Sequence, residues 1–274
     1  MRSRSKETRR GRQALGGLPP LSDRTVSLKS PREVEAIYAA SQVVAQVIAA
    51  LREAIKPGMT TRDLDQLAKE LYRKHGARSG TLGYYGFPGQ LCVSVNDEVI
   101  HGIPGKRRIE AGDLVKLDVV AVKDGYYGDA AVTVPVGEVR PEVERLMRVT
   151  EEATLRGIAQ AVPGNHIGDI SSAIQQYVES QGLSVVKEFV GHGIGRAMHE
   201  APNVPNCGLA PGKGLLLVPG MVLAIEPQVN LGTAAVRMLD DGWTAVTQDG
   251  KWSAHYEHTV AITPQGPRIL TRLT

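Results

Sequence analysis

Four acidic residues occupy matching places in two halves of this 274-residue chain. Asp118 and Glu226 each follow a glycine by six residues, and a second acid, Asp129 or Glu257, comes later in each half beside an apolar run. An ionised carboxylate in an apolar strand loses its hydration, which is unfavourable unless a partner compensates. Four such groups at one place stay ionised together only if cations offset their charge. The pattern therefore predicts a centre with a pair of metal ions.

Histidines in the same two halves are candidates for completing such a centre. Both halves contain the triplet His-Gly-Ile, beginning at His101 and at His192, and His199 follows the second triplet. Glycines on both sides of His192 would let the backbone approach a crowded centre. Carboxylate and imidazole ligands without thiolate indicate Mn, Fe, Co or Zn rather than a closed structural zinc site. Two such ions would polarise a carbonyl and lower the pKa of bound water, which is the chemistry of hydrolysis.

Other catalytic arrangements fit the sequence less well. The chain has no Gly-x-Ser-x-Gly motif, and the glycines around His192 open no βαβ unit, which argues against nucleotide binding. Cys92 lies in a strand-like run without a basic neighbour, so we expect it to line a wall rather than act as a nucleophile. The chain has two cysteines, Cys92 and Cys207, far apart in sequence. They form no disulfide framework or zinc module, so we expect a reducing, cytoplasmic compartment.

An internal repeat explains why the acids occur in matched pairs. Residues 56–64 and 162–170 share a Pro-Gly pair, an aspartate and an aliphatic residue at a fixed offset of 106 positions. Each segment continues with apolar residues three and four apart, as in an amphipathic helix, and ends at a glycine, Gly76 or Gly182. Each half thus contains a helix that precedes its pair of acids.

A longer helix is expected before each repeated helix, beginning at Pro31 after a capping box and at Pro141. The strands expected after the helices are 90–95, 114–122 and 130–136 in the first half, and 215–218, 221–225 and 259–262 in the second. Two halves of the order helix–helix–strands predict an α+β fold with helices covering a curved antiparallel sheet. We expect one domain at 30–274, with pseudo-symmetric halves of about 30–138 and 139–274.

The start of the chain differs in composition from the rest. Residues 1–12 hold six basic groups and one acid, a net charge of +5. Because the whole chain carries +3, the remainder carries −2. We expect residues 1–29 to form a basic, disordered extension. Electrostatic contact with ribosomal RNA is the alternative, and a transit peptide is disfavoured by the scarcity of apolar residues. No apolar run of about 18 residues stands out, so no membrane association is expected.

In these motifs the chain resembles the type I methionine aminopeptidases, which have the creatinase-like "pita-bread" fold. The resemblance extends from about Ser30 to the C-terminus. It is carried by residues 81–88, 96–104, 116–119, 191–199, 225–227, 241–244 and 254–259. It implies a monomeric enzyme that removes the initiator methionine from nascent polypeptides whose second residue is small.

The resemblance also implies a role for individual residues. Asp118 would bind one of two divalent ions, Asp129 and Glu257 would bridge both, and His192 and Glu226 would complete the shell of the other ion. Glu226 would also manage the proton of the attacking water. His101 and His199 would contact the scissile amide and the developing oxyanion. The implied methionine pocket consists of Tyr84, Phe87, Cys92 and Trp243, with Phe189 nearby.

The chain departs from the family pattern at a few places near this pocket. Thr81 stands where many members have cysteine, Met198 stands where bacterial members commonly have phenylalanine, and residues 204–207 replace a more typical Val-x-His-Tyr. None of these positions is an implied metal ligand. Core packing is the alternative role of Met198 and Phe189.

Three other functions remain to be weighed. An X-Pro peptidase of the same fold usually has a sizeable N-terminal domain, whereas only about thirty residues precede the first helix here. A type II methionine aminopeptidase has an insertion that would lengthen the segment from His192 to Glu226. A non-catalytic binding protein on this fold would lack metal ligands, and all five are present. These comparisons favour the metallopeptidase.

Overall fold

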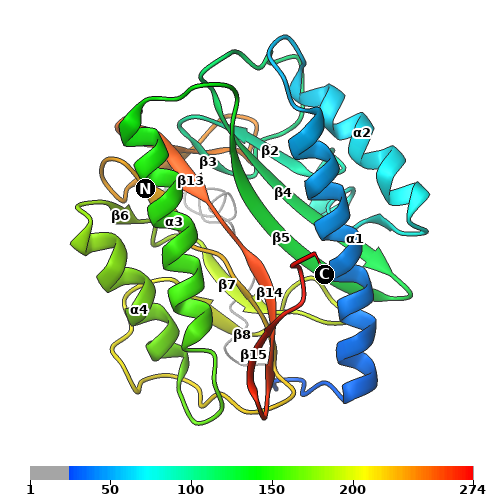
Figure 1. Ribbon diagram of the computed structural model, residues 1–274, viewed down its shortest axis with the longest axis vertical. Helices are drawn as coiled ribbons and strands as arrows, with labels where there is room; N and C mark the ends of the chain where they lie inside the picture. Colours follow the sequence, from blue (N-terminus) through cyan, green and yellow to red (C-terminus); the bar gives the residue numbers. More distant parts are fainter. Residues whose placement is uncertain (1–24, 274) are drawn as a thin grey trace, which may run out of the picture.

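The computed structural model describes residues 25–273, which form four long helices and a set of antiparallel sheets (Figure 1). The helices are α1 (Pro31–Ala54), α2 (Thr61–Lys74), α3 (Pro141–Ala159) and α4 (Ile167–Ser180). The strands of the first half are β1 (Arg78–Ser79), β2 (Cys92–Val95), β3 (Glu98–Ile100), β4 (Leu114–Lys123) and β5 (Tyr126–Pro135). Those of the second half are β6 (Ser184–Val185), β7 (Val190–Gly193), β8 (Glu200–Pro205), β9 (Val222–Ile225), β10 (Gln228–Asn230), β11 (Val236–Met238), β12 (Ala245–Thr247), β13 (Ser253–His255), β14 (His258–Thr263) and β15 (Gly266–Ile269). The α+β prediction is confirmed. Residues 1–24, most of the expected extension, lie outside the described range.

The repeat seen in the sequence is present in the helices. Both the first and the last residue of α4 lie 106 positions after those of α2. Each helix begins with a capping box, in which the backbone N–H of Thr60 or His166 donates to the aspartate three residues later, in each case over 2.7 Å. Gly76 and Gly182, which follow the two helices, have φ angles of 63° and 68°, a conformation that glycine adopts at low cost.

Helix α1 differs from one sequence expectation. An 18-residue window of this helix has a mean hydropathy of 1.5, so α1 is long and apolar enough to cross a membrane, contrary to the expectation that no such run exists. Half of that window is buried inside the protein. The helix lies along β4 and β5 (Figure 1). Its apolar character is therefore explained by the core that it covers.

Two sheets hold the strands that carry the acids. In the first sheet β4 is the central strand. One edge of β4 pairs with the short strands β1 and β2, and the other edge pairs with β5. Strands β4 and β5 form a hairpin whose turn, Asp124-Gly125, has positive φ angles at both residues, as the twist of a two-residue hairpin requires. The second sheet has the order β15-β14-β9-β7-β8, with antiparallel pairing throughout.

The two sheets meet where β5 lies beside β14. The Thr259 hydroxyl accepts from the Asp129 N–H over 3.1 Å and donates to the Asp129 carbonyl over 2.7 Å. The Glu257 N–H donates to the Ala131 carbonyl over 2.9 Å. One acid of each half therefore lies at the junction of the two sheets.

The strand predictions were partly wrong. Residues 215–218 form no strand beyond an isolated bridge from Leu216 to His166, and Leu215 and Leu216 are exposed. Strand β5 begins at Tyr126, four residues before its predicted start, because the tight hairpin extends the pairing to Lys123. Several short strands, among them β7 and β10 to β13, have only three or four residues, too few to show a period in the sequence.

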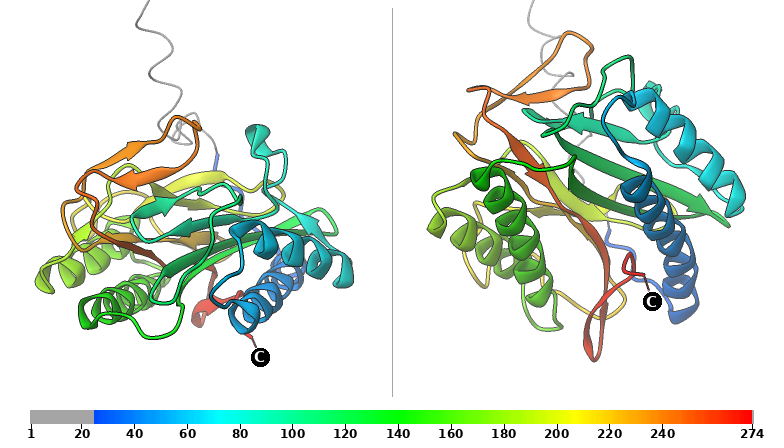
Figure 2. Two further views of the ribbon diagram at one scale, coloured as in Figure 1. Left: turned by 90° about the horizontal axis from the view of Figure 1, so that it is seen from above. Right: turned by 45° about the horizontal axis from the view of Figure 1, so that its top comes forward.

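All four helices lie on one side of the sheets, and the strands around residues 236–247 lie on the opposite side (Figure 2, left). The pair α1 and α2 covers the first sheet, and the pair α3 and α4 covers the second, each over its own apolar core cluster. The C-terminal residues return to α1, where the Gln42 amide donates to the carbonyls of Leu270 and Arg272.

The contact between α1 and β5 is close enough to require glycine at one position. A Cβ atom at Gly128 would lie 2.6 Å from the Ser41 backbone nitrogen and 2.7 Å from its Cα. Because backbone cannot move aside as a flexible side chain can, Gly128→Ala should lower the free energy of unfolding by roughly 1–3 kcal/mol in urea titrations. Gly105→Ala, where the added Cβ would meet the nearest atom at 3.7 Å, is the matched control. Equal stability of both variants and the wild type would contradict this packing.

Candidate functional site

Strand pairing brings the two acids of the first half to the same face of the β4–β5 hairpin. Asp129 pairs with Val120, and Asp118 pairs with Ala131, so the two aspartates are diagonal neighbours on one face. Cys92 of β2 lies opposite Asp118 on the other side of β4. The acids of the second half lie next to a strand pair, since Glu226 follows β9 and Glu257 precedes β14, which pair at Ile225 and His258.

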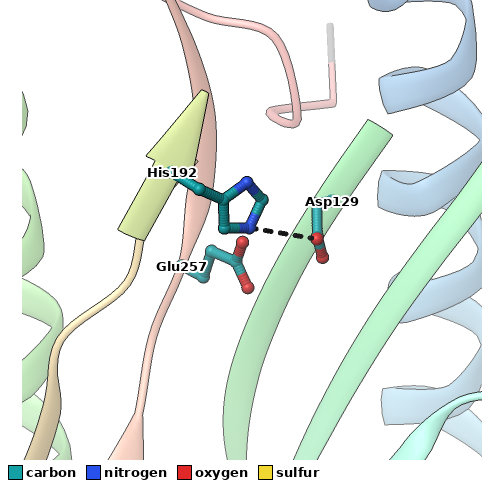
Figure 3. Close-up of side chains that lie close together, drawn as sticks. All are labelled: Asp129, His192 and Glu257. Atoms are coloured by element: carbon teal, nitrogen blue, oxygen red, sulfur yellow. Dashed lines mark ion pairs between the residues drawn. The ribbon is translucent and has the colours of Figure 1, made fainter. Parts of the chain in front are cut away.

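Three of the predicted ligands form a compact group at the junction of the sheets. One ligand atom each of Asp129, His192 and Glu257 lies within 4.8 Å of the other two (Figure 3). All three side chains are buried. His192 Nε2 lies 3.9 Å from Asp129 Oδ2 and 3.4 Å from Glu226 Oε1, so Glu226 adjoins the same group. The structure thus brings together residues from β5, β7 and the adjoining ends of β9 and β14.

The His192 ring is oriented as a metal ligand. Its Nδ1 lies 2.8 Å from the Gly193 carbonyl, so the proton of the neutral ring belongs on Nδ1 and Nε2 faces the carboxylates with a free lone pair. Burial lowers the pKa of His192 to about 4, which keeps the ring neutral at pH 7. A Cβ at Gly191 would lie 2.3 Å from the Ala224 carbonyl oxygen, and one at Gly193 would lie 2.2 Å from that of Ala201. The glycines therefore permit the close approach of β7 to its neighbours.

The four carboxyl groups resist ionisation where they lie. Burial raises the pKa of Asp118 to about 7. Burial, and then the charges of Asp118 and Glu226, raise the pKa of Asp129 well above its usual range. The pKa of Glu226 and that of Glu257 are raised by burial first and by neighbouring acids second. Asp118 therefore belongs electrostatically to the group, although it lies outside the three-residue cluster.

Two oxygens in this cluster lack a partner. Within residues 25–273, neither Asp129 Oδ1 nor Glu257 Oε1 has a hydrogen-bond donor, although both atoms are buried. Buried polar atoms are normally paired, so an unpaired carboxylate oxygen needs an explanation. A divalent cation would supply both the missing partner and the missing positive charge. The donor set of carboxylates and one neutral imidazole fits Mn, Fe, Co or Zn.

The histidines expected to contact substrate lie beside this group. The rings of His199 and His192 are 4.2 Å apart between centroids. His199 Nδ1 lies 2.7 Å from the Tyr84 hydroxyl, which ties a predicted pocket residue to a predicted catalytic residue. His101, with a φ angle of 60°, packs edge-on against Phe189 at 5.5 Å, and burial lowers the pKa of His101 to about 4.

The remaining predicted pocket residues fall in two places. Phe87 and Trp243 contact each other edge to face at 5.2 Å. Cys92 is buried beside Asp118, and burial raises the pKa of its thiol, which agrees with a wall residue and not with a nucleophile. Phe189 packs in an apolar cluster with Val99 and Ile100, as a core residue would, and also contacts the His101 ring.

The positions that depart from the family pattern have structural partners. The Thr81 hydroxyl donates to the Gln90 carbonyl over 2.8 Å. Met198 is buried. The Asn206 amide lies 3.3 Å from the carbonyl oxygens of both Phe189 and Glu226, so this side chain links a pocket residue to an implied ligand.

Sequence reasoning missed residues that bind or adjoin the predicted ligands. The Gln228 amide donates to the Glu226 carboxylate over 3.2 Å and to the Glu226 carbonyl over 2.6 Å. His255 Nε2 lies 4.0 Å from Glu257 Oε2. Thr259 binds the backbone of Asp129. All three lie two residues from a predicted ligand in the sequence. Since residues two apart on a strand face the same side, this spacing could have indicated that they lie near the ligands.

Comparisons with known proteins agree with this geometry. Residues 35–264 match metallopeptidase family M24. The chain is 51% identical over 246 residues to a methionine aminopeptidase of Clostridium perfringens, which covers 90% of this chain and 98% of that protein. It is 49% identical to methionine aminopeptidase 1 of Bacillus subtilis, over 89% of this chain and 98% of that protein.

Solved structures agree with the sequence relatives. The methionine aminopeptidase of Thermotoga maritima superposes with a TM-score of 0.89 at 45% identity, covering 91% of this chain and all of that chain. This chain belongs to the methionine aminopeptidases of metallopeptidase family M24. The methionine aminopeptidase resemblance and its pita-bread fold are thus confirmed, and type I agrees with the bacterial relatives. A prolidase from Pyrococcus furiosus shares the fold with a TM-score of 0.72 at 23% identity, and this chain covers 66% of it.

The raised pKa values predict how metal binding depends on pH. A carboxyl whose folded pKa lies above its unfolded value favours the fold at low pH, and this contribution is lost as pH rises through the folded pKa. At pH 6 the carboxyl groups of the metal-free site therefore hold protons, and a cation must displace them to bind. At pH 8 these carboxyl groups hold fewer protons. His192 is neutral at both values and contributes little to the difference.

We therefore expect the metal-induced rise in Tm, at equal free metal, to be larger at pH 8 than at pH 6. Each proton that the metal displaces changes the free energy of metal binding by up to about 1.4 kcal/mol per pH unit. Calorimetry of the metal-free and metal-loaded protein at the two pH values measures this difference directly. The same rise in Tm at both values would show that the buried acids hold no protons.

Proposed function

We propose that this methionine aminopeptidase removes the initiator methionine from newly made polypeptides whose second residue is small. The observation that carries the proposal is the buried group of Asp129, His192 and Glu257 with Glu226 alongside, in which carboxylate oxygens lack partners. The names of the bacterial relatives support the substrate class.

The residues present fit two divalent ions. Asp118 would hold one ion, Asp129 and Glu257 would be shared between both, and His192 and Glu226 would hold the other. When bound, the ions supply Lewis acidity and a water of lowered pKa. Co, Mn, Fe and Zn all suit this donor set.

The chain's own residues would position the substrate and move the protons. Glu226, oriented by Gln228 and with a raised pKa, is suited to take a proton from water and return it to the leaving amine. Burial lowers the pKa of His199, so its ring is neutral. When the Tyr84 hydroxyl donates to Nδ1, the ring proton resides on Nε2, which becomes a donor toward a developing oxyanion. Neutral His101 would bind the scissile amide.

A methionine side chain would be recognised by apolar and sulfur-containing groups. Tyr84, Phe87, Cys92 and Trp243 supply three aromatic rings and a buried thiol, with which a thioether makes favourable contacts. The edge-to-face contact of Phe87 and Trp243 gives one wall a defined shape.

The other features of the proposal concern the whole chain. Residues 30–274 would form one catalytic domain, acting as a monomer in the cytoplasm. The basic residues of the N-terminal extension would contact the ribosome, where nascent N-termini appear. An X-Pro peptidase is disfavoured because the fold relatives of that class share less than 25% identity with this chain, which supports the fold alone.

The first test is the metal-dependent release of methionine from a Met-Ala-Ser peptide. The protein is stripped of metal and reloaded separately with Co, Mn, Fe or Zn, and Met-Pro and Ala-Pro peptides are assayed in parallel. We expect free methionine from Met-Ala-Ser only after reloading, with no cleavage of Ala-Pro. Cleavage only before proline, in Met-Pro and Ala-Pro but not in Met-Ala-Ser, would favour the X-Pro peptidase. A folded, metal-loaded protein that cleaves none of the peptides would leave a binding protein as the better description.

Substitution of the shared ligand tests the assignment of the site. Asp129→Asn preserves the shape of a buried side chain while removing its charge, and Asp118→Ala removes a peripheral ligand. Each should lower kcat/KM for Met-Ala-Ser by at least about 100-fold, since loss of a residue that merely orients a ligand already costs 10- to 100-fold. Glu152→Gln on the exposed surface of α3 is the control and should leave the rate unchanged. Full activity of Asp118→Ala would place the metal elsewhere.

A further inference from the structure

The turn that carries His199 joins two strands of the second sheet. Strands β7 and β8 pair antiparallel, with Gly193 opposite Glu200, and residues 194–199 connect them. His199 is the last residue of this turn, and its ring lies 4.2 Å from that of the implied ligand His192. Whatever fixes this turn therefore also fixes the position of His199.

A buried ion pair links the turn to the segment before α1. Lys29 Nζ lies 2.5 Å from Glu200 Oε2 and 2.8 Å from the Ser27 carbonyl, and the Lys29 side chain is 5% exposed. The Lys29 N–H donates to the Gly220 carbonyl over 2.7 Å. Lys29, the last residue of the expected N-terminal extension, thus contacts both the turn and residue 220.

Glu200 uses its second oxygen within the turn. Glu200 Oε1 accepts from the Ala197 N–H over 3.1 Å, so the one carboxylate binds both the turn and Lys29. A Cβ at Gly195 would lie 2.5 Å from Lys29 Cε and 2.8 Å from Glu200 Oε1. A side chain at position 195 would therefore displace one partner of the ion pair.

A second, exposed contact joins the same two segments. Arg196 Nε lies 3.9 Å from Glu33 Oε1 in the first turn of α1, and the guanidinium lies over the Tyr126 ring at 4.4 Å. An exposed pair of this kind contributes little by itself. The Lys29–Glu200 pair carries more weight because it is largely shielded from solvent, and removing the Glu200 charge leaves the Lys29 ammonium with the Ser27 carbonyl as its remaining partner.

We propose that the Lys29–Glu200 ion pair positions His199 for contact with the substrate. The inference rests on the proposed function, in which the His199 ring donates toward the developing oxyanion. Neither Lys29 nor Glu200 is an implied metal ligand, so both act through the turn and are positioning residues. A displacement of about 1 Å at a catalytic group costs on the order of 100-fold in rate, so a small movement of the turn is enough to be measured.

The test uses the full-length, metal-loaded enzyme with Glu200→Gln and Lys29→Met. We expect each variant to lower kcat for methionine release from Met-Ala-Ser by about 10- to 100-fold, with Kd for Co retained within about twofold because His192 and the acids stay in place. Glu152→Gln, which breaks the exposed Glu152–Arg156 pair on α3, is the matched control and should match the wild type. Unchanged kcat in Glu200→Gln would overturn the proposal. So would an equal loss of Co affinity, which indicates general damage to the site.

A double-mutant cycle identifies the residue through which the pair acts. If the pair works through His199, adding Glu200→Gln to His199→Ala should cause no further loss of kcat. Losses that multiply would show that the pair acts elsewhere and would overturn the proposal. If a variant fails to fold, Glu200→Asp decides, because it keeps the charge but shortens the side chain. An intermediate kcat supports positioning, and a wild-type kcat contradicts it.

The same assay separates this inference from the proposed function. Absence of methionine release by the wild type would refute the proposed function and the role of the pair with it. Full activity of His199→Ala would remove the catalytic role of His199 alone. Normal activity in the wild type, a strong loss in His199→Ala and no loss in Glu200→Gln would refute only the positioning role.

Discussion

The mutual repulsion of four acids gathered at one largely buried place is the interaction on which the rest of this structure depends. Asp129, Glu226 and Glu257 are buried, and Asp118 is partly so, and the pKa of each is raised by burial and, for three of them, by neighbouring acids. These acids stay together only if the strands that carry them are held rigidly. On a flexible backbone the carboxyl groups would move apart into water. The hairpin β4–β5 and the strands β9 and β14 supply that support, and the helices all lie on the opposite side of the sheets from the strands around residues 236–247.

The supporting contacts are mostly made by backbone and by small residues. Glycines at 191 and 193 let β7 approach its neighbours, Thr259 binds the backbone of Asp129 across the junction, and Gln228 holds the Glu226 carboxylate. Each of these contacts fixes one ligand without adding another charge. The neutral rings of His192 and His199 likewise occupy the site without altering its charge balance.

The features predicted from sequence were those with a local or periodic signal. The repeated helices were found because caps, apolar spacing and terminal glycines all lie within each segment, and the acids because they recur at matching positions. The strand expected at 215–218 is absent because an apolar run alone does not show whether a partner strand is available. Lys29, Gln228 and His255 were missed because their importance depends on residues distant in sequence or on the final pairing of strands. The apolar composition of α1 was underrated because the core that it covers is formed by strands more than sixty positions later.

The position of the proposed ligands on either side of the β5–β14 junction has a mechanical consequence. Asp118 and Asp129 belong to the first half of the chain, whereas His192, Glu226 and Glu257 belong to the second. A cation bound among them would act as a cross-link that closes long loops between the halves, in the way that a disulfide restricts an unfolded chain. Neither half holds a complete set of ligands, so the centre can form only after both have folded and docked. Metal occupancy would therefore report on assembly of the whole molecule, and loss of metal would leave the junction to the hydrogen bonds between β5 and the segment around β14.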